Sequence, residues 1–232
     1  MGKIIVIDGL DGTGKQTQSE LLFKYIKDKN EKVKLIAFPR YNSSTGLIIK
    51  EYLSGKINSN DGIGFNDRIR TGLLYSYDRM YNMYFIRDEK GNSIMDYYNN
   101  GYTIICDRYT SSNYLFMTCG MDMSQFSEFI NTIEEIEYTH MGLPEPDMTI
   151  FLEMPPEKSL ELIEKRGEEK DLHENLEILN KAYNSLQLYK SFLMEKSADT
   201  MKKTYFINCM DELMKLYSKE DISEMVKNLL QM

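Results

Sequence analysis

The segment GLDGTGKQTQ, at positions 9–18, has the residue types and spacing of a phosphate-binding loop, G-x-x-x-x-G-K-[ST], up to the last position of that pattern. Glycines at positions 9, 12 and 14 allow the backbone to curl until its N–H groups point at phosphate oxygens. A lysine after the last glycine can reach the β- and γ-phosphates of a nucleotide. The predicted ATP-binding residues are Gly9, Gly12, Thr13, Gly14, Lys15, Gln16 and Thr17.

The predicted metal site has one weakened position and one strong candidate. Gln16 stands where the pattern has Ser or Thr, whose hydroxyl binds Mg²⁺ directly. A Gln amide oxygen is longer and differently aimed, so we expect altered metal ligation and intact phosphate binding. Asp107 ends the apolar run IICD, which is typical of a carboxylate that holds Mg²⁺, often through water.

Other candidates surround these two motifs. In FPRY (38–41), Phe38 would form an apolar wall and Arg40 would face the ligand edge of a sheet. Tyr75 and Arg79 are one helical turn apart, so they could stack on a planar base and bind its edge, although core aromatics beside a surface arginine would give the same pattern. Asp11 is an acid within a phosphate loop, which indicates either a functional group or a solvated loop residue.

The segment KRGEEKDLHE (165–174) packs charges around a glycine between two predicted helices. Such a segment is either a solvated loop or a lid that brings Lys165, Arg166 or Lys170 over the transferring phosphate. His140 is interpreted as a loop histidine without a catalytic role.

The elements that must position these residues alternate between strands and helices. Nearly continuous apolar runs predict buried strands at 3–9, 33–39, 102–109, 147–154 and 204–210. Helical patterns lie at 15–29, 66–87, 124–139, 157–166, 172–197 and 211–230, with loops at 54–65 and 88–100. Tyr77, Met80, Tyr81 and Met83 are interpreted as core residues. This alternation predicts one doubly wound α/β domain over residues 1–232, with a parallel sheet covered on both faces.

Composition narrows the function classes. The net charge of −8 argues against a sequence-independent nucleic-acid binder, which needs a basic face. Three cysteines at irregular spacings favour reduced thiols over a disulfide framework or a zinc site. No apolar run reaches the roughly 18 residues of a membrane span, and no signal peptide is expected. These features favour a cytoplasmic protein without membrane or nucleic-acid partners.

Taken together and in this order, the motifs resemble the thymidylate kinase family. The resemblance rests on GLDGTGKQT (9–17), AFPRY (37–41), YSYDR (75–79), DRYTSSN (107–113), GLPEPD (142–147) and the lid-like segment. It runs from Lys3 to about Tyr189. It implies a P-loop-type three-layer fold with five strands in the order 2-3-1-4-5, a homodimer, and Mg²⁺-dependent phosphorylation of dTMP by ATP in dTTP biosynthesis.

The resemblance also implies roles for individual residues. Asp11 would bind near the deoxyribose 3′-hydroxyl, Arg40 and Arg108 would hold the dTMP phosphate, and Asp107 would hold Mg²⁺ through water. Further substrate-binding residues would be Phe38, Tyr75, Arg79, Ser112, Asn113, Phe116, His173 and Glu174, with Phe116 disfavouring a ribose. Lys15, Asp11, Arg40, Arg108 and Arg166 would form the catalytic set.

Some positions depart from the family pattern. Gly12 stands where some members carry a basic residue, so the catalytic cation is expected from the lid segment, with Arg166 as the candidate. Tyr75 replaces a frequent Phe, and His173 replaces a frequent Tyr, which leaves open a kinase for another deoxynucleotide such as dUMP. Gln16 leaves open a nucleotide-binding regulator without turnover.

Overall fold

The computed structural model describes residues 1–29, 31–56, 64–167, 173–195 and 203–230. One parallel sheet has five strands in the order β2-β3-β1-β4-β5, which confirms the predicted order. The strands are β1 (Lys3–Gly9), β2 (Val33–Ala37), β3 (Thr103–Asp107), β4 (Met148–Glu153) and β5 (Thr204–Asn208). Each strand lies within the apolar run that predicted it.

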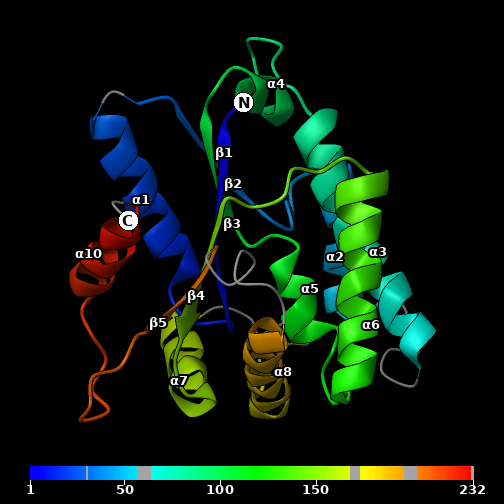
Figure 1. Ribbon diagram of the computed structural model, residues 1–232. Coiled ribbons are helices and arrows are strands. Elements are labelled where there is room, and N and C mark those ends of the chain that lie inside the picture. Colours follow the sequence, from blue (N-terminus) through cyan, green and yellow to red (C-terminus); the bar gives the residue numbers. More distant parts are fainter. Residues whose placement is uncertain (30, 57–63, 168–172, 196–202, 231–232) are drawn as a thin grey trace.

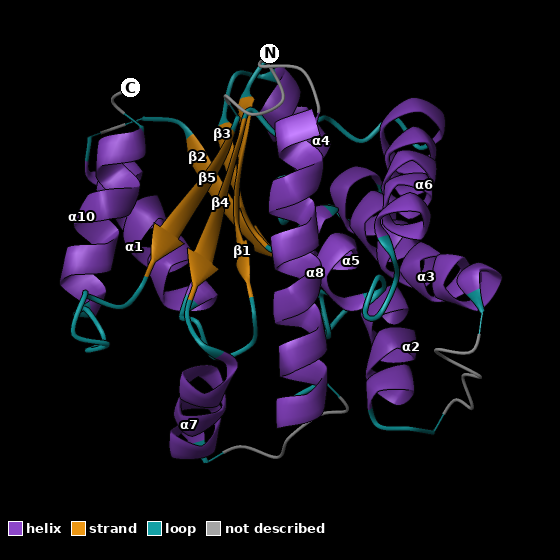
Figure 2. Cartoon of the chain, turned by 60° about the horizontal axis from the view of Figure 1, so that its bottom comes forward, coloured by secondary structure: helices purple, strands orange, loops and turns teal. Residues whose placement is uncertain are grey.

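Helices cover both faces of the sheet and give the expected three layers (Figure 1). One face is covered by α1 (Lys15–Asp28) and α10 (Lys219–Leu229). On the opposite side lie α3 (Phe65–Tyr84), α5 (Ser111–Phe116), α6 (Met123–Glu134) and α8 (Leu176–Glu195), as Figure 2 shows. Helix α7 (Pro156–Arg166) lies beyond the carboxyl ends of the strands (Figure 2).

The core explains why the strand sequences are apolar throughout. Successive side chains of a strand point to opposite faces, and both faces of this sheet are covered. Ile5 and Ile7 pack with residues of α1 and α10, whereas Ile4 and Val6 pack with Met83 on the other face. Met83 is fully buried, as predicted.

Three short helices were not predicted: α2 (Ser44–Leu53), α4 (Ile94–Asn99) and α5. Helix α4 lies inside the predicted loop 88–100, where Ser93 and Asp96 form a reciprocal capping box. Of the predicted loop 54–65, residues 57–63 lie outside the described residues, and α3 begins at its last position.

Two helices have different bounds from those predicted, and one residue predicted in the core is exposed. The helix predicted at 124–139 continues as a π-helix, η1 (Glu135–His140). His140 is therefore the last residue of a helix, whereas the sequence predicted it in a loop. The helix predicted at 211–230 begins only at Lys219, because residues 211–217 form a turn in which the main chains of Asp211 and Lys215 are hydrogen-bonded. Tyr77 is 48% exposed, since it lies on the outer face of α3.

Among the described helices, none combines the length and apolar character that crossing a bilayer requires.

Candidate active site

The candidate site lies at the carboxyl edge of the central strands. Asp107 at the end of β3 is in register with Ile7 of β1 on one side and with Ala37 of β2 on the other. The segments that follow these three strands therefore meet at one edge of the sheet. This is the edge where open α/β sheets bind ligands, as the sequence predicts.

The phosphate loop has the backbone that its glycines predict. Gly9 and Gly12 have φ values of 141° and 79°, and Gly14 precedes α1 with φ 86°. A Cβ atom on Gly9 would lie 2.4 Å from the main-chain oxygen of Leu152, and one on Gly12 would lie 2.5 Å from that of Ser159. Side chains are excluded at both positions, so the backbone itself can approach a ligand.

Lys15 lies at the amino end of α1 with its side chain buried. Its ammonium donates to the main-chain oxygen of Leu10 at 2.6 Å and lies 3.7 Å from Oδ1 of Asp11. Burial, together with the nearby charge of Arg108, lowers the pKa of Lys15 to about 8. The side chain is therefore held beneath the loop, where the helix N-terminus also favours an anion.

A cavity of about 950 Å³ opens over this loop, and we call it the phosphate-loop cavity. Gln16 and Thr17 line it with exposed side chains, and the amide of Gln16 donates to Glu20 at 2.9 Å. Thr13 is buried instead, and its hydroxyl bonds the main-chain oxygen of Leu10 at 2.8 Å. The loop residues thus divide between lining the cavity and fixing the loop.

Arg108 occupies the centre of the site in a strained conformation. Its φ of 66° is rare for a residue with a side chain. The guanidinium pairs with the carboxylate of Asp11 and lies 3.8 Å from that of Asp8. Burial acts to raise the pKa of Asp11, but Arg108 and Lys15 outweigh it and hold that pKa below its ordinary value.

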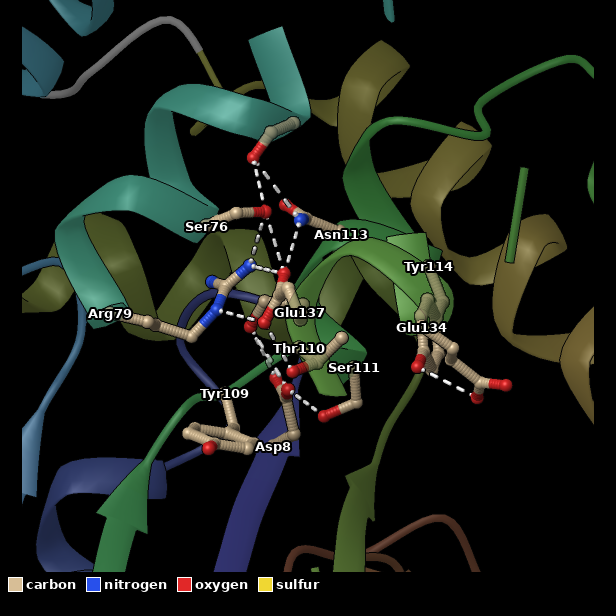
Figure 3. A network of polar contacts seen from close by, with 12 residues as sticks. Asp8, Ser76, Arg79, Tyr109, Thr110, Ser111, Asn113, Tyr114, Glu134 and Glu137 are labelled. Carbon is tan, nitrogen blue, oxygen red and sulfur yellow. Dashed lines mark hydrogen bonds and ion pairs between the residues drawn. The ribbon is translucent and has the colours of Figure 1, made fainter. Parts of the chain in front are cut away.

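Asp8 is a site residue that the sequence reasoning missed. Its fully buried carboxylate accepts a hydrogen bond from Ser111 at 2.6 Å (Figure 3). It also accepts from Ser112 at 2.9 Å and from the main-chain amide of Gly9 at 2.8 Å. It thereby ties the phosphate loop to α5. The signal was available, because Asp8 interrupts an apolar run near the end of a strand, as Asp107 does.

Asp107 has the environment of a carboxylate that can receive a cation. Burial raises its pKa, while Lys15 and Arg108 act in the opposite direction. Among the described residues, none donates a hydrogen bond to its carboxylate, and no group of three acidic, His or Cys side chains could enclose a metal. Mg²⁺ commonly uses one or two carboxylates plus substrate phosphates and water, so Asp107 beside the phosphate loop fits that ion.

A second pocket adjoins the phosphate-loop cavity, and we call it the aromatic pocket. Its predicted lining residues include Asp11, Phe38, Tyr75, Arg79, Arg108, Ser112, Asn113, Phe116 and His173. The ring of His173 stacks on that of Phe116, with centroids 5.2 Å apart and planes at 8°. Substrate-binding candidates from five separate segments are therefore brought together.

Arg79 is not a surface residue. Its side chain is 2% exposed and forms an ion pair with Glu137 of η1, as Figure 3 shows. The sequence reasoning did not identify Glu137, although it lies four residues after the core residue Ile133, on the apolar stripe of the predicted helix. An acid on such a stripe signals a buried carboxylate with a partner.

Arg166 lines the phosphate-loop cavity, whereas Arg40 lines neither that cavity nor the aromatic pocket. Arg166 ends α7, pairs with Glu174 at 2.7 Å and lines the phosphate-loop cavity. Lys165 instead pairs with Glu161 on the surface, and Lys170 lies outside the described residues. Arg40 lines a separate cavity of about 530 Å³ beside β2.

The segment that carries Arg40 is nevertheless fixed to α3. The main-chain amide of Arg40 donates to Oδ2 of Asp78 at 3.0 Å. The other oxygen of this buried carboxylate accepts from Thr45 at 2.6 Å and from Asn82 at 2.8 Å. Asp78, which the sequence reasoning left without a role, therefore anchors the FPRY segment beside the aromatic pocket.

Comparisons with known proteins agree with this geometry. A family model described as thymidylate kinase matches residues 7–204. The thymidylate kinase of Plasmodium falciparum is 31% identical over 84% of this chain and 79% of its own length. That of Schizosaccharomyces pombe is 31% identical over 84% and 80%, respectively. A solved structure of thymidylate kinase from Candida albicans superposes with a TM-score of 0.67 at 22% identity, covering 99% of this chain and 91% of that one. The chain therefore belongs to the thymidylate kinase family.

Proposed function

We propose that this chain transfers the γ-phosphoryl group of ATP to the 5′-phosphate of dTMP, giving dTDP and ADP for dTTP synthesis. One observation carries the proposal: Asp11 and Arg108 line both the phosphate-loop cavity and the aromatic pocket. Phosphoryl transfer requires a donor and an acceptor phosphate to meet in line. Two adjoining cavities that share a cation and an acid provide such a meeting point.

On the donor side, the loop amides and Lys15 bind the ATP phosphates. Asp107 holds Mg²⁺, which supplies charge neutralisation at the phosphate oxygens when bound. Arg166 adds a cation from the end of α7, and residues 168–172 of the predicted lid segment 165–174 lie outside the described residues. Arg108 faces the transferring group between the two cavities, so it stabilises the charge that spreads over the phosphate oxygens during transfer.

On the acceptor side, the aromatic pocket takes thymidine. Tyr75 stacks on the base and Arg79 meets its edge, with Asn113 beside them. Phe38 forms a wall, and Phe116 crowds the position of a ribose 2′-hydroxyl. Further substrate-binding residues are Asp11, Ser112, His173 and Glu174, together with Arg40 at the acceptor phosphate.

The test is a rate panel with purified chain, Mg·ATP and equal concentrations of dTMP, dUMP, dCMP and TMP with a ribose. We expect dTDP and ADP in equal amounts and the highest kcat/KM for dTMP. Equal rates for dUMP would favour the alternative substrate, to which Tyr75 and His173 point. ATP binding without dTDP formation would favour a regulator, to which Gln16 points.

We further propose that the chain folds as one domain and acts as a homodimer in the cytoplasm. Support for a dimer comes from α3, where Tyr77, Tyr81 and Phe85 form a row of rings with centroids about 6 Å apart. Tyr77 and Phe85 are 48% and 63% exposed. Light scattering of wild-type and Tyr77→Asp protein tests this, with a monomeric mass expected for the variant.

A further inference from the structure

We infer that Glu137 positions Arg79 and Asn113 and thereby sets base selectivity in the aromatic pocket. The inference rests on the proposed function, in which these two side chains meet the base. Glu137 itself does not line the pocket. It acts from behind Arg79, as a positioning residue (Figure 3).

The carboxylate of Glu137 is fully buried and is surrounded by donors. Its Oε2 accepts from Nε of Arg79 at 2.9 Å and from Thr110 at 2.6 Å. Its Oε1 accepts from Nη2 of Arg79 at 2.5 Å and from Ser76 at 2.7 Å. A buried carboxylate is tolerated only when it is paired and hydrogen-bonded in this way, so its geometry is fixed.

The pairing determines which edge of the guanidinium is available. Nε and Nη2 of Arg79 are used by Glu137 in a two-point contact, which restrains the plane of the group. Among the described residues, none accepts a hydrogen bond from Nη1. Because Arg79 lines the aromatic pocket, Nη1 is the donor left for a ligand there.

The same carboxylate also orients Asn113. Its Nδ2 lies 3.4 Å from Oε1 of Glu137 and 3.3 Å from the main-chain oxygen of Gly72. With the amide nitrogen turned this way, the side-chain oxygen remains for a donor on the ligand, and no described residue donates to it. The same pocket is therefore lined by a residue with an available donor, Arg79, and by one with an available acceptor, Asn113.

This pair matches a pyrimidine that carries a 4-carbonyl oxygen next to an N3–H group, as thymine and uracil do. Cytosine has an amino group and an unprotonated nitrogen at these positions, so it would place donor against donor and acceptor against acceptor. Buried polar groups left without partners discriminate strongly. Glu137 thus favours 4-oxo pyrimidines through the two side chains that it holds.

The experiment compares Glu137→Gln with Glu134→Gln as a matched control. Glu134 lies on the preceding turn and accepts from Tyr114 at 3.0 Å (Figure 3). It does not line the aromatic pocket. We expect Glu137→Gln to raise KM for dTMP about tenfold or more and to lower the selectivity for dTMP over dCMP. KM for ATP should stay within about twofold, and the control should leave all three unchanged.

A double-mutant cycle with Arg79→Met tests whether Glu137 acts through Arg79. In the Arg79→Met background, Glu137→Gln should raise KM for dTMP by a clearly smaller factor, because only the part that acts through Asn113 remains. An equal rise in both backgrounds would overturn the inference, as would a lower melting temperature with unchanged KM and selectivity. If Glu137→Gln does not fold, Thr110→Val removes one hydrogen bond from the same carboxylate without removing charge. That variant should lower the selectivity about twofold or more, and unchanged selectivity in it would overturn the inference.

Measurements on the unmodified chain distinguish failure of the proposed function from failure of the inference about Glu137. If it forms no dTDP, the proposed function fails and the inference fails with it. If it forms dTDP while Glu137→Gln keeps wild-type KM and selectivity, only the inference fails.

Discussion

The ammonium of Lys15 donates a hydrogen bond of 2.6 Å to the main-chain oxygen of Leu10. This carbonyl belongs to the phosphate loop itself, so the cation is held beneath the proposed phosphate site. A nucleotide can then exchange the carbonyl for phosphate oxygens without a large movement of the lysine. Preorganised charge of this kind lowers the barrier to phosphoryl transfer.

Lys15→Ala should lower kcat by about 10²-fold or more, because it removes a charge that meets the transferring phosphate. Binding of dTMP should change little, since Lys15 does not line the aromatic pocket. ADP formation and dTMP titration calorimetry measure the two effects. Lys181→Ala, which removes an exposed lysine paired with Glu177, is the control. Equal loss of dTMP affinity and turnover would contradict these roles.

The pKa of Lys15 predicts a pH dependence for ATP use. In the free protein this pKa is about 8, so kcat/KM for ATP should fall as pH rises through 8 and the ammonium is lost. Lys15→Arg keeps its charge at high pH, so its lower activity should vary less over pH 7–9. A wild-type profile that is flat over this range would contradict the prediction.

The same pKa predicts that the stability of the folded chain rises with pH, whereas ATP use falls. The ordinary pKa of 10.5 applies to the unfolded chain, and the folded value is about 8. Between these values the unfolded chain binds more protons, so the contribution of Lys15 to the free energy of unfolding rises with pH. The stabilisation of Lys15→Met relative to wild type should therefore shrink between pH 8 and 10.5, as denaturant unfolding at several pH values can measure.

The proposed role of Arg166 as the catalytic cation can be tested with the neighbouring Lys165 as a control. Arg166 lines the phosphate-loop cavity, whereas Lys165 pairs with Glu161 at the surface. Arg166→Met should lower kcat by about tenfold or more, and Lys165→Met should leave it within about twofold. Steady-state rates at saturating ATP and dTMP measure both. Similar losses in the two variants would indicate a general charge effect and remove Arg166 from the catalytic set.

The sheet could be predicted because its signal is local. Strands buried on both faces need continuous apolar sequence, and each of the five runs contains its strand. The short helices α2 and α4 were missed because they depend on single caps, Ser43 and Ser93, more than on long apolar periodicity. Helix α5 depends on tertiary bonds from Ser111 and Ser112 to Asp8.

In the candidate site, too, local motifs could be predicted from the sequence and pairings between distant segments could not. The glycines and Lys15 form a contiguous motif, so their arrangement follows from the sequence. The pairing of Arg79 with Glu137 joins residues 58 positions apart, and local spacing contains no information about it. The position of Arg40 also depends on packing, since Asp78, 38 positions away, accepts a hydrogen bond from its main-chain amide.

Substitutions at Asp107 and Gln16 should change the Mg²⁺ concentration for half-maximal activity in opposite directions. Asp107→Asn removes a carboxylate that fits the ion, so the Mg²⁺ concentration for half-maximal activity should rise about tenfold. Gln16→Thr introduces the hydroxyl that phosphate loops usually supply, so the same concentration should fall. The second change should cost little stability, because the side chain of Gln16 is exposed and bonds only Glu20 among the described residues.

Both variants can be compared in one Mg²⁺ titration at fixed ATP, with Asp67→Asn as the control. Asp67 pairs with Arg70 at the start of α3, away from the phosphate-loop cavity, so its curve should match the wild type. If Gln16→Thr leaves the curve unchanged while Asp107→Asn shifts it, the residue after Lys15 does not reach the ion in this protein. Asp107, phosphate oxygens and water would then complete its coordination. If neither variant shifts the curve, Asp107 is not the metal ligand.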